Sequence, residues 1–260
     1  MRAVVQSMGL IVIVVALTAC ASEIPPSRLG DYVSTGQTGI SEALRGVGQH
    51  PLEAGLVLIS DTADPGAVPN LPDEALTRLG DKLRQEIARI IPVTIKDIIP
   101  AGHLRPGADG NAAELSELGR QRKLDYLVVV VLSSTEQEYP VTLFLGWTTH
   151  AQPGFRRDNW SLLEFALVDL REDKTLMKAE GRGWATLDRP AAPGINQWYP
   201  VIYLRPQDPE RHIWPPTFEG APKTLRVVSF NQAQKRLVLA IQSAWIEYLE
   251  AYRAERSGSS

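Results

Sequence analysis

Acidic side chains gather around one loop that follows an apolar run. Residues 55–60 read GLVLIS, and Asp61, Asp64, Asp73 and Glu74 come soon after them. Loops at the carboxyl ends of strands are common ligand positions in α/β folds. Paired carboxylates there can bind a cation or act as general acid and base. The same residue types are ordinary choices in loops and at helix starts. The carboxylates Asp61 and Asp64 therefore define an alternative reading, in which the protein is a hydrolase.

The histidines and the glycine pair offer less chemistry. None of the histidines has a second histidine or a cysteine at the spacing of a metal-ligand pair: His50, His103, His150 and His212. A zinc site needs three or four nitrogen, sulfur or oxygen ligands. Neither metalloprotease, nucleophile-elbow nor phosphate-loop motifs occur. Gly181-Arg182-Gly183 lacks a third glycine and falls within an expected strand, so it indicates a helix packed closely on a sheet. We expect no metal, no cofactor and no catalytic activity.

Cys20, the single cysteine, has a distinctive position. It ends an apolar run, MGLIVIVVALTA at 8–19, which follows the basic residue Arg2. This run has 12 residues, whereas a membrane-spanning helix needs about 20. A basic start, an apolar middle and small residues before the cut are the parts of a secretory signal. A disulfide within one chain is excluded, because no partner cysteine exists.

LTAC, residues 17–20, resembles the bacterial lipobox, in which leucine and two small or polar residues precede the cysteine. The resemblance implies that residues 1–19 are a cleaved signal peptide and that Cys20 carries a diacylglycerol and an acylated amino group. Two or three acyl chains hold a protein firmly at a membrane. Ala21, in place of the aspartate that retains lipoproteins of Gram-negative bacteria in the inner membrane, implies the outer membrane and a periplasm-facing domain. An ordinary signal peptide or an uncleaved anchor is the alternative.

The charge balance excludes one class of partner. Without residues 1–19, the chain carries 26 basic and 30 acidic side chains, a balance of −4. A nucleic-acid partner calls for a clustered basic face. We therefore expect no nucleic acid and no electrostatic membrane patch, so that the lipid alone provides the anchor.

The elements behind these residues predict one α/β domain, 53–253, after a lipidated tether, 20–52, and before a disordered tail, 254–260. Strands are expected at 55–60, 93–99, 124–134, 139–147, 160–170 and 177–187, and helices at 73–91, about 112–123 with Asn111 as cap, and 230–253. Four consecutive valines, 128–131, predict a central strand that is covered on both faces. Arg171 to Lys174 suits a hairpin turn. The fold class is a mixed sheet with helices packed on it and a carboxy-terminal helix.

Residues 188–225 contain eight prolines and several aromatic residues. They are too aromatic for a flexible linker and too rich in proline for regular structure, so we expect an ordered surface excursion. Trp198, Tyr199, Tyr203 and Trp214 are candidate contacts with a protein partner, because aromatic residues are favoured at binding hot spots. The alternative is that they cover the edge of the domain's own core.

Two segments resemble a recurrent fold of envelope proteins: ELSELGRQRKLDYLVVVVLSS, 114–134, and LLEFALVDLREDKTLMKAEGRG, 162–183. They are similar to the periplasmic domains of the curli-secretion lipoproteins, of the lipoprotein activators of penicillin-binding proteins and of the amino-terminal TolB domain. The resemblance implies a non-catalytic, lipid-anchored protein that binds an envelope partner, in assembly or secretion. Only 139–150 resembles a membrane hairpin of the curli pore, so we expect no pore.

Overall fold

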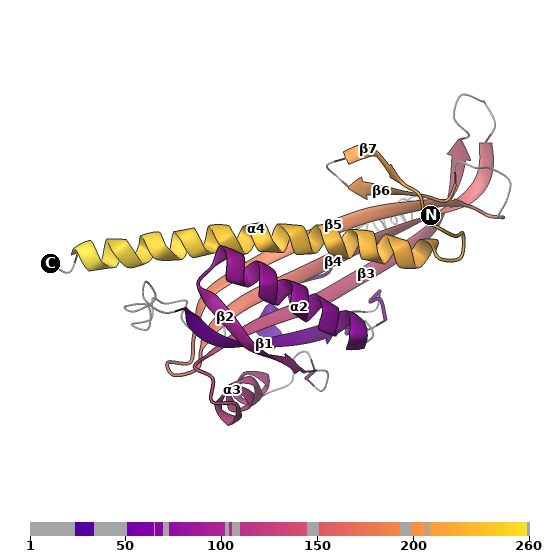
Figure 1. The fold of residues 1–260 in the computed structure, drawn as a ribbon. Coiled ribbons are helices and arrows are strands. Elements are labelled where there is room, and N and C mark those ends of the chain that lie inside the picture. Colours follow the sequence, from indigo (N-terminus) through magenta and orange to yellow (C-terminus); the bar gives the residue numbers. More distant parts are fainter. Residues whose placement is uncertain are drawn as a thin grey trace, which may run out of the picture.

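The structure of the chain is a computed structural model. It describes residues 24–33, 51–64, 66–69, 73–101, 104–105, 110–144, 151–192, 199–205 and 208–258. The strands are β1 (Leu52–Asp61), β2 (Val93–Pro100), β3 (Tyr126–Phe144), β4 (Ala151–Asp169), β5 (Lys174–Pro190), β6 (Val201–Arg205) and β7 (Asp208–Ile213). The helices are η1 (Leu29–Asp31), α2 (Asp73–Ile90), α3 (Asn111–Gln121) and α4 (Ala221–Gly258). The strands form one mixed sheet in the order β2-β1-β3-β4-β5-β6-β7 (Figure 1).

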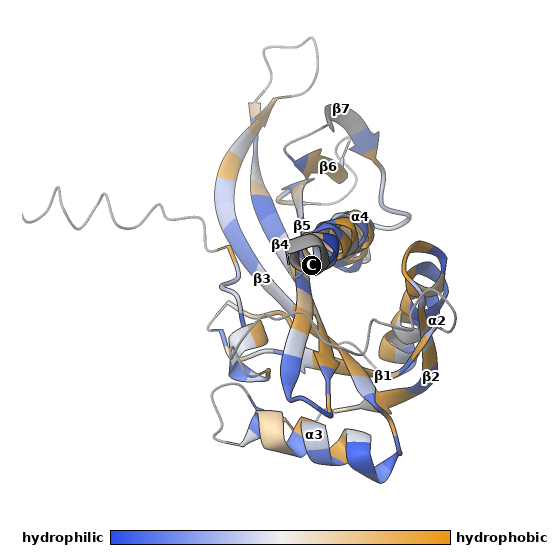
Figure 2. Cartoon of the chain, turned by 90° about the vertical axis from the view of Figure 1, so that its left-hand side faces the viewer, coloured by the Kyte–Doolittle hydropathy of each residue, from blue (hydrophilic) through white to orange (hydrophobic). Residues whose placement is uncertain are grey.

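Strand β3 lies in the middle of this sheet, parallel to β1 and antiparallel to β4. Its side chains alternate between two cores. Val128 and Val130 belong to the core shared with α2 and α4, and Val129 and Val131 belong to the core shared with η1 and α3. Figure 2 shows α2 and α4 side by side on one side of the sheet, away from α3. The prediction of an α/β fold with a central strand covered on both faces is confirmed.

Helix α4 packs directly on the backbone of β5. A Cβ atom at Gly181 would lie 2.2 Å from the Ala233 carbonyl oxygen, and one at Gly183 would lie 2.0 Å from that of Ser229. Only glycine leaves room for such a close approach. The interpretation of Gly181-Arg182-Gly183 as a helix-packing site is therefore confirmed.

Strands β3 and β4 form a longer hairpin than the sequence predicts. The sequence predicts a separate strand at 139–147, but Tyr139–Phe144 is the outer part of β3, and β4 begins at Ala151 rather than at Trp160. The pairing of β3 with β1 ends at Ser133, and from there to Phe144 the residues of β3 pair with β4. Pro140 is tolerated there, because an edge strand does not need every N–H in the ladder.

The expectation that residues 188–225 lack regular structure is wrong. Strands β6 and β7 extend the sheet, and α4 begins at Ala221, before the expected start at Phe230. The prolines occupy positions that strands and helices allow. Pro200 directly precedes β6, Pro209 lies in the outermost strand, and Pro222 is the second residue of α4.

Asn111 has a different role from the expected helix cap. It is the first residue of α3, and Gly110, with a φ of 100°, precedes it. Its side-chain amide donates to the carbonyl oxygens of Asp31, at 2.8 Å, and Arg105, at 2.7 Å. Asn111 therefore joins α3 to the segment around η1.

Candidate functional site

The acidic loop holds the N-terminal arm, which we define as residues 24–33. Arg28 contacts Asp64 at 2.5 Å and Asp61 at 3.9 Å. Asp61 also accepts hydrogen bonds from the Tyr32 hydroxyl, at 3.2 Å, and from the backbone N–H of Ala63, at 2.8 Å. The two candidate carboxylates are thus brought together, and their partners are an arginine and a tyrosine of the chain itself.

Tyr32 is suited to this role because it stays protonated. Burial, and then the negative charge of Asp61, raise the pKa of the Tyr32 hydroxyl above its usual range. The hydroxyl therefore remains a donor to the Asp61 carboxylate at neutral pH. Of the other two candidate acids, Asp73 begins α2 and Glu74 follows it with an exposed side chain, so Glu74 is not part of this group.

Glu164 is the second anchor of the arm, and the sequence analysis missed it. Its side chain on β4 is 2 % exposed. Its carboxylate accepts hydrogen bonds from the backbone N–H groups of Arg28, at 2.7 Å, and Leu29, at 3.1 Å, and from the Ser27 hydroxyl. The first N–H groups of a helix have no partner within the helix. At the start of η1, the Glu164 carboxylate is the acceptor for two of them. The sequence feature that could have indicated this anchor is a single glutamate within the apolar run LLEFALV.

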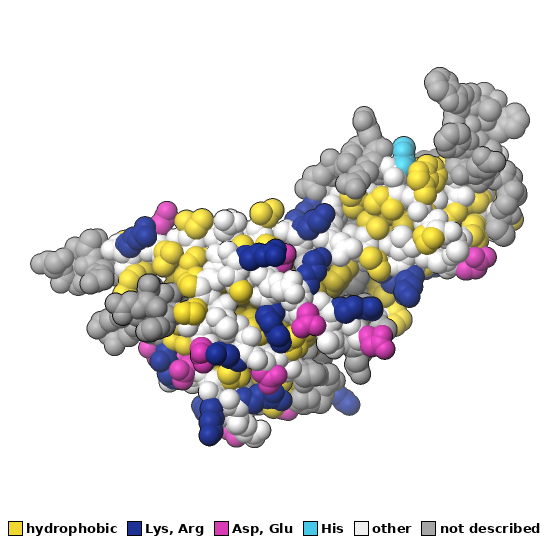
Figure 3. Space-filling model, in the orientation of Figure 1, with side chains coloured by type: hydrophobic (Ala, Val, Ile, Leu, Met, Phe, Trp, Pro, Cys, Tyr) yellow, Lys and Arg dark blue, Asp and Glu magenta, His cyan; other side chains and the backbone are white. Residues whose placement is uncertain are grey.

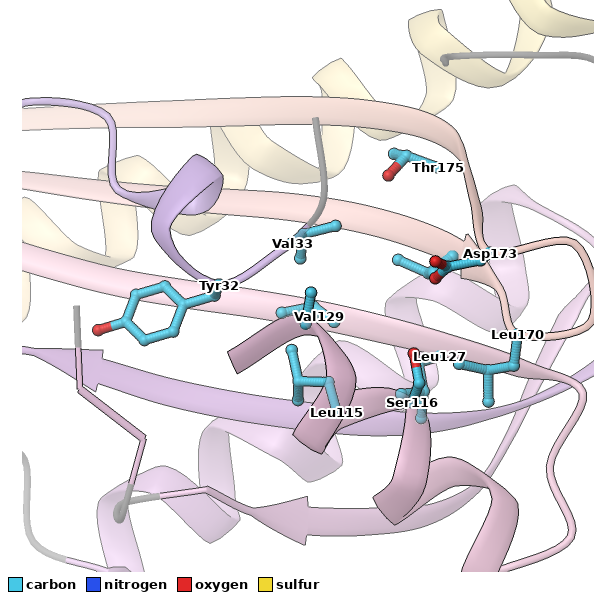
Figure 4. A pocket seen from close by; sticks show the side chains of 11 residues that line it. Tyr32, Val33, Leu115, Ser116, Leu127, Val129, Leu170, Asp173 and Thr175 are labelled. Atoms are coloured by element: carbon cyan, nitrogen blue, oxygen red, sulfur yellow. The ribbon is translucent and has the colours of Figure 1, made fainter. Parts of the chain in front are cut away.

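The cavity beneath the arm is small (Figure 4). It lies between η1, α3 and the sheet, where Val33, Leu115 and Val129 line it. Its volume is about 20 Å³, which is room for about one water molecule. This cavity is a gap in the core rather than a substrate site.

Two of the four candidate partner contacts, Tyr203 and Trp214, lie together at the β6–β7 end of the sheet. Tyr203 and His212 lie opposite each other, with ring centroids 5.1 Å apart, and Trp214 follows at 6.0 Å from His212. Arg205 lies over the Tyr203 ring at 5.5 Å. Trp214 is 49 % exposed. Figure 3 shows hydrophobic side chains gathered over this end of the molecule.

Tyr199 lies apart from that group, since its hydroxyl donates to the Phe144 carbonyl oxygen at the outer end of β3. Burial, and then the negative charge of Asp188, raise the pKa of the Tyr203 hydroxyl to about 12, so this hydroxyl stays protonated at neutral pH. Trp198 lies outside the described residues. The structure thus brings Tyr203 and Trp214 together and gives Tyr199 a structural contact.

A shallow depression lies on the arm side of β4 and β5, with a volume of about 160 Å³. Trp160 and Trp184 stack at its base, with ring centroids 5.9 Å apart. Ile24, Pro25 and Arg182 also line it. The depression therefore joins the start of the arm to an aromatic pair on the sheet.

The remaining candidates have structural positions or lie outside the described residues. Asn159-Trp160-Ser161 has the sequence of a glycosylation sequon, but Asn159 is fully buried. Asp169, at the end of β4, accepts hydrogen bonds from the β4–β5 turn. Outside the described residues are Cys20, His50, His103 and His150. Among the described residues, no three histidine, cysteine, aspartate or glutamate side chains lie close enough to hold a metal ion. None of the described helices combines the length and apolarity that crossing a bilayer requires.

The similarity of this chain to known proteins is low. No family model matches the chain, and no curated protein is significantly similar to it. A putative neuraminyllactose-binding hemagglutinin homolog from Helicobacter pylori is 10 % identical, with a TM-score of 0.37, and the match covers 78 % of this chain and 94 % of that one.

Two further solved structures are less similar. Lipoprotein GNA1162 from Neisseria meningitidis is 13 % identical, with a TM-score of 0.28, over 56 % of this chain and 88 % of its own. A dodecamer of a PelC variant from Paraburkholderia phytofirmans is 12 % identical, with a TM-score of 0.27, over 71 % of this chain and 92 % of its own. One of these neighbours is thus described as a lipoprotein, but scores at this level establish neither family nor activity.

Proposed function

We propose that this chain is a non-catalytic lipoprotein of the bacterial outer membrane, which faces the periplasm and binds a protein partner there. The observation that carries the proposal is Cys20, the only cysteine, placed directly after an apolar run and the residues LTA. A thiol at that point is available for alkylation by a diacylglycerol. Acyl chains attached there would provide the membrane affinity.

The geometry of the acidic loop supports a non-catalytic role. The alternative function, an envelope hydrolase, depends on Asp61 and Asp64 as free carboxylates. Both are engaged by Arg28, and Asp61 by Tyr32 as well. A carboxylate that holds the chain's own arm is removed from contact with a substrate.

The aromatic group at the β6–β7 end supports binding to a protein. Tyrosine, tryptophan and arginine are the residues most enriched at binding hot spots. Tyr203, Trp214 and Arg205 lie within one group there, and Trp214 is half exposed. This group is the proposed contact surface for a partner in envelope assembly or secretion.

The anchor is tested by growth with labelled palmitate and by membrane fractionation. The wild-type protein should take up label and sediment with the outer membrane, and Cys20→Ser should lose both properties. Wild-type protein without label contradicts the anchor.

The partner surface is tested with a photo-crosslinking residue at Trp214, and with the same residue at Leu239 on α4 as the matched control. A discrete protein adduct should form at position 214 and not at 239. Equal labelling at both positions contradicts the surface. Hydrolysis of envelope material that Asp61→Asn abolishes would contradict the non-catalytic role.

A further inference from the structure

The start of the arm lies a short chain distance from the proposed anchor. Four peptide units separate Cys20 from Ile24, the first described residue. A fully extended chain spans at most about 3.6 Å per residue, so the two Cα atoms lie within about 14 Å of each other. This limit holds for every conformation of the residues between them.

The arm is also fixed to the body of the domain. Ser27, Arg28 and Leu29 donate to the buried carboxylate of Glu164, and Arg28 pairs with Asp64. Pro25 is buried and lines the depression beside Trp160. Without these contacts, the next fixed point is Leu29, which is buried in the core together with Tyr32 and Val33, at a reach of about 32 Å from Cys20. The contacts therefore shorten the tether about twofold.

A short tether restricts the orientations that the folded domain can adopt at a membrane. A folded domain of this size is about 40 Å across. A tether of about 14 Å cannot bring the outer face of the α2 and α4 layer, on the far side of the sheet, to a bilayer that holds the acyl chains next to Ile24. The arm side of β4 and β5 is the side that remains close.

The chemistry of that side suits the headgroup layer of a bilayer. Ile24 is 50 % exposed, and the Trp160–Trp184 pair lies in the same depression. Tryptophan is enriched at membrane–water interfaces. Arg182 and Arg236 line the rim, and the exposed Arg182 also pairs with Glu180. The side thus offers an exposed aliphatic residue, the partly exposed Trp184 stacked on the buried Trp160, and cationic groups.

We infer that the clamp of the arm on Glu164 seats the arm-side depression, with Ile24, Trp160, Trp184 and Arg182, on the surface of the bilayer that holds the Cys20 acyl chains. This inference rests on the proposed lipid anchor. It adds an orientation: the outer face of α4, which carries the exposed Leu239, points toward the aqueous space, and only the α4 edge at Arg236 lies near the depression.

The test uses the lipidated full chain in vesicles of phosphatidylethanolamine and phosphatidylglycerol. Acylation consumes the Cys20 thiol, so Arg182→Cys or Leu239→Cys each provides the single free thiol for a donor fluorophore. Energy transfer to an acceptor on the lipid headgroups reports proximity to the membrane. The transfer efficiency at position 182 should be at least twofold that at position 239, and equal efficiencies overturn the inference.

Two further variants test the clamp as the cause. Glu164→Ala, which removes the acceptor of the Ser27, Arg28 and Leu29 donors, should reduce the ratio of the two efficiencies toward one, whereas Glu117→Ala, on the surface of α3, should leave it unchanged. Insertion of about twenty glycine and serine residues after Ser22 leaves the folded body intact and adds about 70 Å of reach. It should also reduce the ratio toward one, and a ratio that persists in both variants overturns the clamp.

The outcomes separate the two proposals. Protein that lacks palmitate label and does not bind the vesicles overturns the anchor and, with it, the orientation. Protein that carries palmitate and binds the vesicles, but shows equal transfer at both positions, overturns the orientation alone. Higher transfer at position 239 would place α4 on the membrane and overturn it as well.

Discussion

Glu164 and Asp61 illustrate how a buried carboxylate can serve the fold. A carboxylate taken out of water needs hydrogen-bond donors in return. Glu164 receives them from the backbone of Arg28 and Leu29, and Asp61 receives them from Tyr32 and Ala63. Hydrogen bonds to a charged group each contribute about 1.5–3 kcal/mol. The N-terminal arm is therefore held by a small number of strong polar contacts.

The raised pKa of Tyr32 makes this attachment sensitive to alkaline pH. A tyrosine in the unfolded chain loses its proton near pH 10, before the buried Tyr32 does. Folding stability from Tyr32 is therefore complete below pH 10 and is lost as the pH rises toward the higher folded value. Urea unfolding between pH 9 and pH 11 should show a steeper fall for the wild type than for Tyr32→Phe. Parallel pH profiles would contradict this role of Tyr32.

At the scale of elements, α4 and β5 approach so closely that the strand needs glycine at 181 and 183. Ser229 of α4 donates from its hydroxyl to the Gly183 carbonyl oxygen, at 3.1 Å, and the two glycines leave no side chain between the layers. Interiors pack at the density of organic crystals. A shift of α4 away from the sheet would therefore break the apolar contacts of its buried face.

Gly183→Ala should destabilise the protein strongly. The new methyl group would meet the Ser229 backbone oxygen at 2.0 Å. Such overpacking costs about 3 kcal/mol, which should appear as a lower urea midpoint. Gly80→Ala in α2 is the comparison. Its methyl group would meet only side-chain ends, at 3.0 Å or more, and alanine favours the helix. Equal midpoints for the two variants would contradict the backbone contact.

At the scale of the whole molecule, α4 joins parts of the chain that are distant in sequence. Trp245 and Tyr248 stack at 5.8 Å and belong to the same core as Leu83 and Ile87 of α2. The first part of α4 packs with Leu187 of β5 and Ile202 of β6. Figure 1 shows α4 running across the sheet and beyond it. The fold should therefore unfold as one unit.

Trp245→Ala tests this unity. Removal of a buried tryptophan costs about 3–5 kcal/mol, and far-UV circular dichroism and tryptophan fluorescence should still report one coincident transition. Ile246→Ala, at a half-exposed neighbour, should change the stability by less than about 1 kcal/mol. Two separate transitions would show that the β6–β7 end folds independently.

Local patterns in the chain were enough to predict much of the sheet and its helices. The valines 128–131, the stripe of α2, the turn at 171–174 and the small-residue face of β5 were all predicted, because each reports the burial of a regular element. Cys20 and Trp198 lie outside the described residues, so their roles remain predictions.

The outer half of β3, the β6–β7 addition and the clamp on the arm depend on tertiary contacts that no local pattern encodes. A proline interrupts a strand only where the backbone N–H that it lacks would be needed by a neighbouring strand. Whether Pro140 and Pro209 have such a neighbour depends on strands elsewhere in the chain. Glu164 meets Arg28 across 136 positions of sequence. A hydrogen bond over such a distance leaves no periodic trace in the sequence, because it depends on where the folded sheet brings the two residues.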